Sequence, residues 1–176
     1  DESDGTVFKL SPKYLIYLNV DREHIDFYKS YSNFKSKIKK YIYRQSKKDS
    51  KIFINNDDYF LSQLKKYSGN IKTFGSNSDA NYSYQLMKLT NKRSYFNFLI
   101  GKKILFKNLS TNLLGEHNVQ NLTAVLSIID DLGYKIKKSH ILSFSGTKRR
   151  MNILGKLKKT IFIDDYAHHP TEIEKL

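Results

Sequence analysis

The run Tyr14-Leu15-Ile16-Tyr17-Leu18-Asn19 sets the fold class of this chain, because a short apolar run followed at once by polar residues is typical of a buried strand. A polar loop follows over residues 19–26. Residues 31–43 then carry apolar side chains at helical spacing, namely Phe34, Ile38 and Ile42. A strand, a loop and a helix in this order predict one unit of an α/β fold.

The same alternation continues downstream. Ile52-Phe53-Ile54 predicts a second strand, residues 57–67 predict a helix with acids in its first turn, and residues 71–74 predict a third strand. Strands that alternate with helices form a mainly parallel sheet with flanking helices. We therefore expect such a sheet over this half of the chain.

The second half changes in texture. Residues 82–106 are rich in Tyr and Phe and are broken by turn residues, which predicts a small antiparallel annex. Helical patterns follow over residues 117–132 and 138–144, and the first of these stops at Gly133. Ile161-Phe162-Ile163 predicts a short buried strand near the end of the chain.

Composition limits the function classes. A chain of 176 residues has room for one well-buried domain. The absence of cysteine excludes a disulfide scaffold and fits a cytoplasmic location. No apolar stretch approaches the roughly 20 residues that span a bilayer, so we expect no membrane association. The net charge of +14 invites a nucleic-acid partner, but the lysines are scattered, so we expect a solvated basic surface and no nucleic acid.

Polar side chains gather directly behind Ile161-Phe162-Ile163. The nonapeptide Asp164-Asp165-Tyr166-Ala167-His168-His169-Pro170-Thr171-Glu172 contains acids, a tyrosine and two histidines. Ligands of open α/β sheets bind beyond the carboxyl ends of the strands, so this segment predicts a site, and Pro170 suits the first turn of a helix. Taken alone, the segment is explained as well by a solvated loop or by metal-ligating histidines.

Acids and a histidine form a second candidate group. Glu2 and Asp4 lie two residues apart, so in an extended segment both carboxylates face one side and could approach a hard cation such as Mg²⁺. A solvated acidic run is the alternative. His24 follows the first predicted strand and is either a capping or core histidine or a metal ligand.

Two further segments carry nucleotide-binding chemistry. In His117-Asn118-Val119-Gln120-Asn121 the histidine and both asparagines fall on adjacent parts of one helical turn. An Asn side chain offers the donor and acceptor that an adenine edge requires, although a helix cap is the alternative. Gly146-Thr147-Lys148-Arg149-Arg150 is either a surface charge run or the source of a guanidinium aimed at phosphate.

Together these segments resemble, in order, the signature motifs of the Mur ligases, the ATP-dependent enzymes that build the peptide of the bacterial cell wall. The five segments are Asp1-Glu2-Ser3-Asp4-Gly5, Asn19-Val20-Asp21-Arg22-Glu23-His24-Ile25-Asp26, Gly115-Glu116-His117-Asn118-Val119-Gln120-Asn121, Gly146-Thr147-Lys148-Arg149-Arg150 and the nonapeptide. The resemblance implies an α/β fold of the P-loop type. Residues 1–158 would be the central ATP-binding domain and residues 159–176 the start of the C-terminal ligase domain.

The resemblance also implies roles for single residues. It assigns Glu2 and His24 to two Mg²⁺ ions and to catalysis, Asn19 to a supporting position near the substrate, and either Arg149 or Arg150 to the transferred phosphate. ATP would be bound by His117, Asn118 and Asn121 on the adenine side, Arg150 at the phosphates, Asp165 at the ribose, and Tyr166 and His168 near the interdomain hinge.

The implied reaction uses ATP and Mg²⁺ to join L-alanine to UDP-N-acetylmuramate through an acyl phosphate. One family motif is missing, because this chain contains no phosphate-binding loop of the Gly-Thr-x-Gly-Lys-Thr type. We therefore expect an incomplete central domain, separated from an amino-terminal domain and most of the C-terminal domain, and inactive by itself. Alternatives are another Mur-type ligase, acting in murein peptide recycling or poly-amino-acid synthesis, a non-catalytic basic binding module, and a structural remnant.

Overall fold

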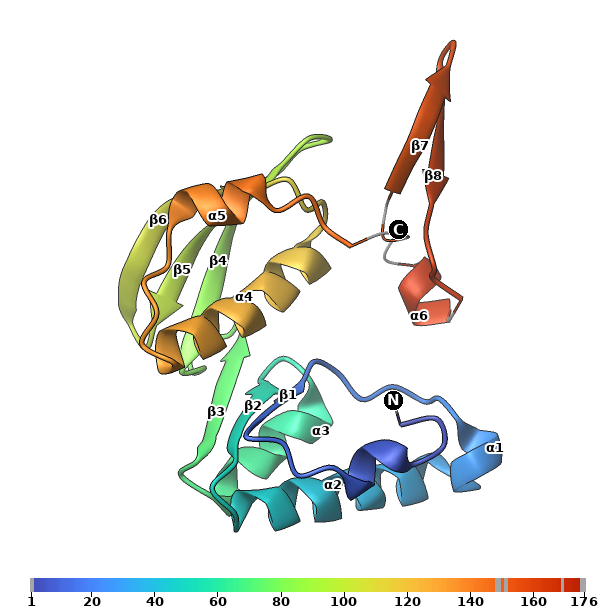
Figure 1. The fold of residues 1–176 in the computed structure, drawn as a ribbon, viewed down its shortest axis with the longest axis vertical. Coiled ribbons are helices and arrows are strands. Elements are labelled where there is room, and N and C mark those ends of the chain that lie inside the picture. Colours follow the sequence, from blue (N-terminus) through green and yellow to red (C-terminus); the bar gives the residue numbers. More distant parts are fainter. Residues whose placement is uncertain (1, 148–149, 151, 169, 175–176) are drawn as a thin grey trace.

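A six-stranded sheet, in the order β1-β2-β3-β4-β5-β6, is the main element of the computed structural model, which describes residues 2–147, 150, 152–168 and 170–174 (Figure 1). The strands are β1 (Tyr14–Tyr17), β2 (Lys51–Asn55), β3 (Ile71–Gly75), β4 (Tyr82–Leu89), β5 (Ser94–Ile100) and β6 (Lys103–Thr111). β1, β2, β3 and β4 pair in parallel, one with the next, whereas β4 with β5 and β5 with β6 pair antiparallel. The predicted α/β class is confirmed, and the antiparallel strands extend the same sheet.

Helices cover both faces of the sheet. The connections between the parallel strands contain α1 (Ile25–Tyr28), α2 (Tyr31–Ser46), α3 (Tyr59–Ser62) and the 3₁₀ turn η2 (Gln63–Tyr67), and a further 3₁₀ turn, η1 (Thr6–Lys9), precedes β1. After β6 come α4 (Glu116–Asp131) and α5 (Lys138–Ser143). Figure 1 shows α2 and α3 beside β1 to β3, and α4 and α5 beside β4 to β6.

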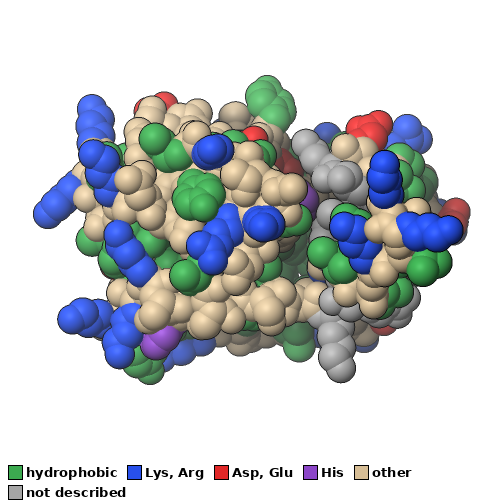
Figure 2. Space-filling model, turned by 90° about the horizontal axis from the view of Figure 1, so that it is seen from above, with side chains coloured by type: hydrophobic (Ala, Val, Ile, Leu, Met, Phe, Trp, Pro, Cys, Tyr) green, Lys and Arg blue, Asp and Glu red, His purple; other side chains and the backbone are tan. Residues whose placement is uncertain are grey.

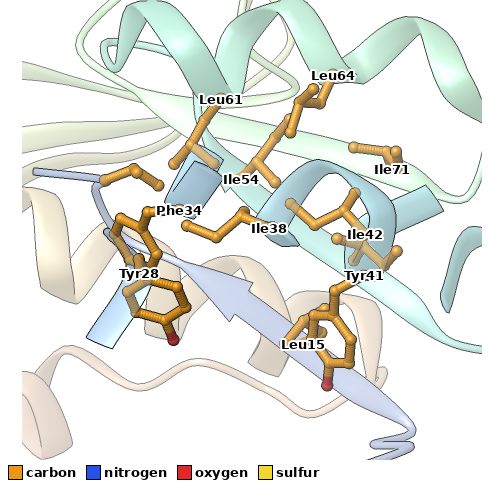
Figure 3. Packing of buried hydrophobic residues seen from close by; sticks show 12 residues of the cluster. Leu15, Tyr28, Phe34, Ile38, Tyr41, Ile42, Ile54, Leu61, Leu64 and Ile71 are labelled. Atoms are coloured by element: carbon orange, nitrogen blue, oxygen red, sulfur yellow. The ribbon is translucent and has the colours of Figure 1, made fainter. Parts of the chain in front are cut away.

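The sheet separates two hydrophobic cores. Ile52 and Ile54 pack with the side chains of α2 and α3, and Figure 3 shows Ile54 in this cluster. Phe53 packs with β4, β5 and α4 on the opposite face. Alternate residues of a strand point to opposite faces, which explains why three consecutive apolar residues serve two cores. The predicted helical spacing is confirmed, since Phe34, Ile38 and Ile42 of α2 are at most 3% exposed.

Two predicted elements are shorter than expected. β1 ends at Tyr17, and the helix expected over residues 57–67 is a single α-turn, α3, continued by the 3₁₀ turn η2. Asp58 does not lie within the first turn but caps it, because its carboxylate accepts a hydrogen bond from the Leu61 amide at 2.8 Å.

The last strands form a separate hairpin. β7 (Asn152–Leu157) and β8 (Thr160–Asp164) make a two-stranded antiparallel sheet, followed by the short helix α6 (Pro170–Ile173), which begins at Pro170 as expected. The prediction that Ile161-Phe162-Ile163 is buried is wrong in this structure, since these side chains are 53%, 51% and 47% exposed. A two-stranded sheet has no second layer to cover them. The proposed domain boundary after residue 158 falls in the hairpin turn and stays a prediction.

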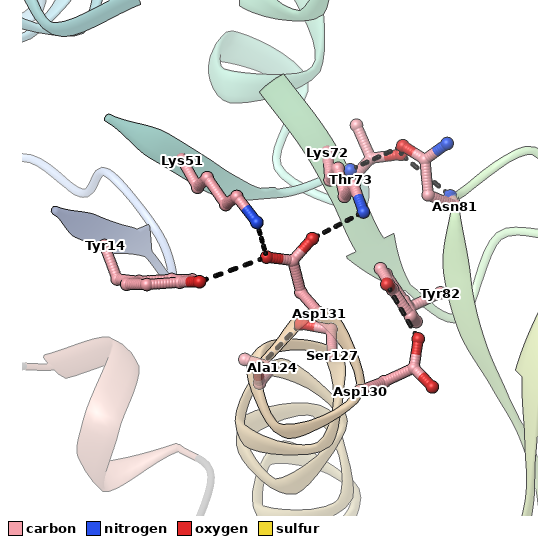
Figure 4. Close-up of polar contacts among 10 residues, drawn as sticks. All are labelled: Tyr14, Lys51, Lys72, Thr73, Asn81, Tyr82, Ala124, Ser127, Asp130 and Asp131. Atoms are coloured by element: carbon pink, nitrogen blue, oxygen red, sulfur yellow. Dashed lines mark hydrogen bonds and ion pairs between the residues drawn. The ribbon is translucent and has the colours of Figure 1, made fainter. Parts of the chain in front are cut away.

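A charged network fixes the C-terminal end of α4 to the start of the parallel strands (Figure 4). The Asp131 carboxylate accepts hydrogen bonds from Lys51 Nζ at 2.8 Å, from Lys72 Nζ at 2.6 Å and from the Tyr14 hydroxyl at 3.4 Å. Burial raises the pKa of Asp131, but the hydrogen bonds from the two lysines outweigh burial and hold this pKa below its usual value. The other end of α4 is thereby directed to the carboxyl ends of the strands.

The surface carries scattered positive charge. Figure 2 shows Lys and Arg side chains spread over the visible face, between polar and apolar side chains. Among the helices that the structure describes, none has the length and apolar character to cross a membrane.

Candidate functional site

The candidate site lies at the carboxyl ends of β1, β2 and β3. The segment after β1 is held at two places. The side-chain amide of Asn55 donates through Nδ2 to the Leu18 carbonyl at 2.8 Å, and the backbone amide of Val20 donates to Asp58 Oδ2 at 2.8 Å. The Val20 carbonyl also accepts a hydrogen bond from the Tyr31 hydroxyl at 2.8 Å. Asn19, predicted as a supporting residue near the substrate, lies between these anchors with an exposed side chain.

Glu2 and His24, predicted as metal ligands, lie together. His24 Nε2 is 3.9 Å from Glu2 Oε1 and 3.7 Å from Glu23 Oε2, and the ligand atoms of all three residues lie within 4.8 Å of one another. His24 adopts a left-handed backbone conformation with φ of 55°, which is uncommon for a residue with a side chain and is enriched at functional sites. Two carboxylates and an imidazole are a suitable donor set for a divalent cation.

The segment around Glu2 is packed against α1. The buried Tyr28 hydroxyl donates a hydrogen bond to the Glu2 carbonyl, and the Phe27 ring lies 3.1 Å from the position that a Cβ on Gly5 would take. Gly5 has a φ of 75°, so a glycine suits both its conformation and this contact. Asp4 takes a local role, because its carboxylate accepts bonds from the Thr6 amide at 2.9 Å and the Thr6 hydroxyl at 2.7 Å.

The hydrogen bond from the Thr6 hydroxyl, together with the smaller effect of the hydrogen bond from the Thr6 amide, lowers the pKa of the Asp4 carboxyl. Asp4 therefore stays ionised and serves the turn at η1. The cluster of potential metal ligands in the described chain contains Glu2, Glu23 and His24. Glu23 was not predicted as a ligand, although it lies within the quoted motif next to His24.

The predicted adenine-side residues lie at the start of α4. Gly115 has a φ of 85°, and a Cβ at this position would lie 2.7 Å from the His117 ring, so the ring is packed against the glycine backbone. The cap position of α4 is Gly115, which makes no side-chain capping bond, so the capping alternative for this segment is not observed. Asn118 Nδ2 instead donates to the Leu114 carbonyl at 2.7 Å. Its amide oxygen is not used in this bond. Asn121 is exposed on the next turn.

The nonapeptide forms a third group, at the end of β8. Arg150 Nη1 lies 3.5 Å from Glu172 Oε1, and Glu172 Oε2 accepts a hydrogen bond from the His168 amide at 3.2 Å. The rings of His168 and Tyr166 meet edge to face at 5.3 Å between centroids.

Asp165 orders the same loop, because its carboxylate accepts a hydrogen bond from the Ala167 amide at 2.8 Å. Glu172 was not predicted as a site residue, yet it joins the arginine to the loop. Arg149, the alternative phosphate-contacting arginine, lies outside the described residues.

The model of the Mur ligase middle domain matches residues 2–129, and the chain belongs to the Mur ligase family.

Individual relatives narrow the similarity. The chain is 37% identical over 187 residues to the UDP-N-acetylmuramate–L-alanine ligase of Pelagibacter ubique, which covers 100% of this chain and 39% of that protein. It is 33% identical over 177 residues to the enzyme of the same name from Aquifex aeolicus, covering 99% of this chain and 38% of that protein. The chain therefore spans about two fifths of the length of these relatives.

Solved structures agree with the family. The UDP-N-acetylmuramate–alanine ligase MurC of Thermotoga maritima superposes with a TM-score of 0.79 at 27% identity, covering 99% of this chain and 39% of that one. MurF of Acinetobacter baumannii gives a TM-score of 0.79 at 21% identity, covering 98% of this chain and 38% of that one, which shows the shared fold.

Proposed function

We propose that this chain is the central, nucleotide-binding part of an ATP-dependent ligase of peptidoglycan precursor synthesis, one that joins L-alanine to UDP-N-acetylmuramate. The observation that carries the proposal is the proximity of Glu2 and His24 at the carboxyl edge of the sheet, where Glu2 Oε1 lies 3.9 Å from His24 Nε2. The names of the relatives from Pelagibacter ubique and Aquifex aeolicus support the substrates. Because the reaction consumes ATP, we assign it to the cytoplasm.

Each group of residues has a separate task in this proposal. Glu2, Glu23 and His24 would hold Mg²⁺, and the bound ion neutralises the negative charge of phosphate and carboxylate. Asn19 supports the substrate beside them. The nucleotide is bound by the adenine-side residues His117, Asn118 and Asn121, by Asp165 at the ribose, and by Arg150, Tyr166 and His168 on the phosphate and hinge side.

The reaction has two steps. A lactyl carboxylate oxygen attacks the γ-phosphorus of ATP, the bond to the bridging oxygen breaks, and ADP leaves. The amine nitrogen of L-alanine then attacks the acyl carbon, the bond from this carbon to the phosphate oxygen breaks, and the amine gives up a proton as the amide forms. Arg150 balances charge on the transferred group, and no enzyme nucleophile is required.

Residues 1–158 would then form the central domain, and residues 159–176 would begin the C-terminal domain. We place the missing phosphate-binding loop, the amino-terminal domain and the rest of the C-terminal domain elsewhere in the same polypeptide, because the relatives are longer than this chain. Without that loop the chain holds the triphosphate poorly, so we expect no turnover from this chain by itself.

The test is an assay of the polypeptide encoded by this segment together with its flanking coding sequence. We expect phosphate release that requires both UDP-N-acetylmuramate and L-alanine, and a hydroxamate when hydroxylamine replaces the amino acid, since hydroxylamine traps acyl phosphates. Glu2→Gln should lower kcat by roughly 100-fold or more, as for loss of a group that stabilises transition-state charge. A start codon and a stop codon directly bounding this segment would overturn the proposal.

A further inference from the structure

We propose that Asn55, Asp57 and Gln120 are positioning residues that set the first turn of α4, and with it His117 and Asn118, against the carboxyl ends of the parallel strands. This inference rests on the proposed function, because it assigns the start of α4 to adenine. None of these three residues carries a role in the sequence-based prediction.

Asp57 gathers the end of β3 and the start of α4. Its Oδ2 atom accepts hydrogen bonds from the Ser76 amide at 2.7 Å and from Gln120 Nε2 at 3.0 Å, and its Oδ1 atom accepts one from the Asn77 amide at 3.2 Å. The carboxylate also lies 2.8 Å from the position that a Cβ on Gly75 would take, and Gly75 has a φ of 155°. The turn after β3 is therefore wrapped around this carboxylate.

Asn55 extends the connection to β1. This residue is 4% exposed, and its Nδ2 atom donates to the Leu18 carbonyl at 2.8 Å, directly before Asn19. Its Oδ1 atom accepts hydrogen bonds from the Asp57 amide at 2.9 Å and from Gln120 Nε2 at 3.4 Å. One buried amide thus connects the end of β1, the loop after β2 and α4.

Gln120 is the only contribution of α4 to this bridge among the contacts described above. It lies three residues after His117, so these two side chains are neighbours on the helix surface, and Asn118 belongs to the same first part of the helix. A primary amide has two N–H donors, which matches the two oxygen acceptors, Asp57 Oδ2 and Asn55 Oδ1. The opposite end of α4 is held by Asp131, so the helix is fastened at both ends and its first turn has a set position.

The position of the first turn of α4 matters for nucleotide binding, because even a small displacement of a binding group strongly weakens its contact with the ligand. An asparagine amide recognises a base edge only when donor and acceptor are aligned together. Through the Gln120 contacts, which end on α4, the bridge therefore acts on the affinity for the adenine nucleotide.

The test compares Gln120→Leu with Gln63→Leu in the complete ligase. Leucine removes the amide with little change in size, and Gln63 is an exposed residue of η2, so the second variant is a matched control. For Gln120→Leu we expect the KM for ATP to rise by about tenfold, as for loss of supporting hydrogen bonds, with the KM for L-alanine unchanged. Equal rises in the KM values of ATP and L-alanine, or no rise relative to Gln63→Leu, would overturn the inference.

Amide hydrogen exchange on the same variants separates the two proposals. Gln120→Leu should speed exchange at residues 76–77 and 116–121 while β5 stays protected, whether or not the ligase is active. If the unmodified ligase shows no ATP-dependent activity, the proposed function fails while exchange still reports on the bridge. Unchanged exchange at both segments would contradict the bridge itself.

Discussion

Gly115 shows at the level of one residue how the backbone prepares the candidate nucleotide site. With φ at 85° and a potential Cβ 2.7 Å from the His117 ring, this position excludes other residue types for two independent reasons. Backbone conformations of this kind, which only glycine adopts easily, are frequent at ligand sites.

We predict that Gly115→Ala destabilises the fold by about 1–3 kcal/mol, the cost of a side chain in a disfavoured backbone region, and displaces the His117 ring. Urea unfolding measures the first effect, and the His117 ring signals in an NMR spectrum report the second. Gly69→Ala is the control, since no atom lies within 4 Å of a Cβ there. Equal stability losses in the two variants would contradict the assigned role.

A second prediction concerns Glu2. If Glu2, Glu23 and His24 bind a divalent cation, Mn²⁺ should bind this chain, and Glu2→Gln should weaken binding by roughly 10-fold or more, because a neutral amide replaces a charged ligand. Electron paramagnetic resonance of free Mn²⁺ during a titration measures the affinity. The matched control is Asp4→Asn, since Asp4 bonds to Thr6 outside the cluster. Unchanged affinity in Glu2→Gln would exclude Glu2 as a ligand.

Single residues were predictable where their chemistry stands out behind a strand. His24 was singled out in this way, whereas Glu2 precedes the first strand. The resemblance to the Mur ligases assigned both to metal, and the structure places them together. Asp57 and Gln120 were missed because each has an ordinary local explanation, an acid at a helix start and a polar helix residue. Their importance comes from a contact between positions far apart in the chain, which no local pattern contains. The polar run Asn55-Asn56-Asp57-Asp58, which begins at the last residue of β2, was the one available signal.

At the level of elements, α4 is a helix held at both ends. The Asp131 network fixes its last turn to β1, β2 and β3, and the Gln120 contacts fix its first. Because both ends of α4 are held, its first turn has a fixed position relative to the carboxyl ends of the parallel strands.

We predict that Asp131→Asn destabilises the chain by about 1–2 kcal/mol at neutral pH, because charge-assisted hydrogen bonds to two lysines are weakened. The folded pKa of Asp131 is lowered from 3.8, so its contribution is complete well above pH 3.8 and is lost as pH falls through the folded pKa. Urea unfolding against pH should therefore show the gap between wild type and variant closing below pH 3.8. A gap that persists at low pH would contradict this origin.

The ion pair of Lys51 with Asp131 also predicts a loss of stability at alkaline pH. The hydrogen bond to Asp131 raises the pKa of Lys51 above 10.5, so its contribution is present below that pH and is lost as pH rises through the raised pKa. This loss belongs to the same pair, so it should be absent from Asp131→Asn. An equal alkaline loss in the variant would assign it to other groups.

The hairpin of β7 and β8 should behave differently from the main sheet. Isolated two-stranded hairpins are marginally stable, and Ile161, Phe162 and Ile163 are about half exposed, whereas Ile52, Phe53 and Ile54 of β2 are fully buried. We predict that amides of the hairpin in this chain exchange with solvent on the order of 100-fold faster than those of β2. Equal protection, measured by mass spectrometry, would show that the hairpin is covered in solution.

The elements also show where sequence patterns succeed. The spacing of Phe34, Ile38 and Ile42 predicted α2 because a helix face must match the sheet that it covers. An apolar run in β8 predicted burial and was wrong, because burial depends on a partner layer that the run itself does not contain. The extent of α3 was overestimated, since its residues continue as a 3₁₀ turn after one α-turn.

At the scale of the whole molecule, one sheet with two cores brings the described motifs of the first 129 residues to one edge. The match to the Mur ligase middle domain covers residues 2–129. This part contains the candidate metal ligands, Asn19 and the start of α4. Arg150 and the nonapeptide follow in the hairpin region. In our proposal Arg150 still belongs to the central domain, and the nonapeptide closes the nucleotide site from the next domain.

The most direct test of this account is mass spectrometry of the product formed by the complete polypeptide from ATP, UDP-N-acetylmuramate and an equimolar mixture of amino acids. We predict one nucleotide product, UDP-N-acetylmuramoyl-L-alanine, formed only when ATP and Mg²⁺ are present. Ligation of a preformed peptide in place of L-alanine would assign the chain to another Mur-type ligase. No ligated product with any acceptor, from a polypeptide that folds and contains its phosphate-binding loop, would contradict the account.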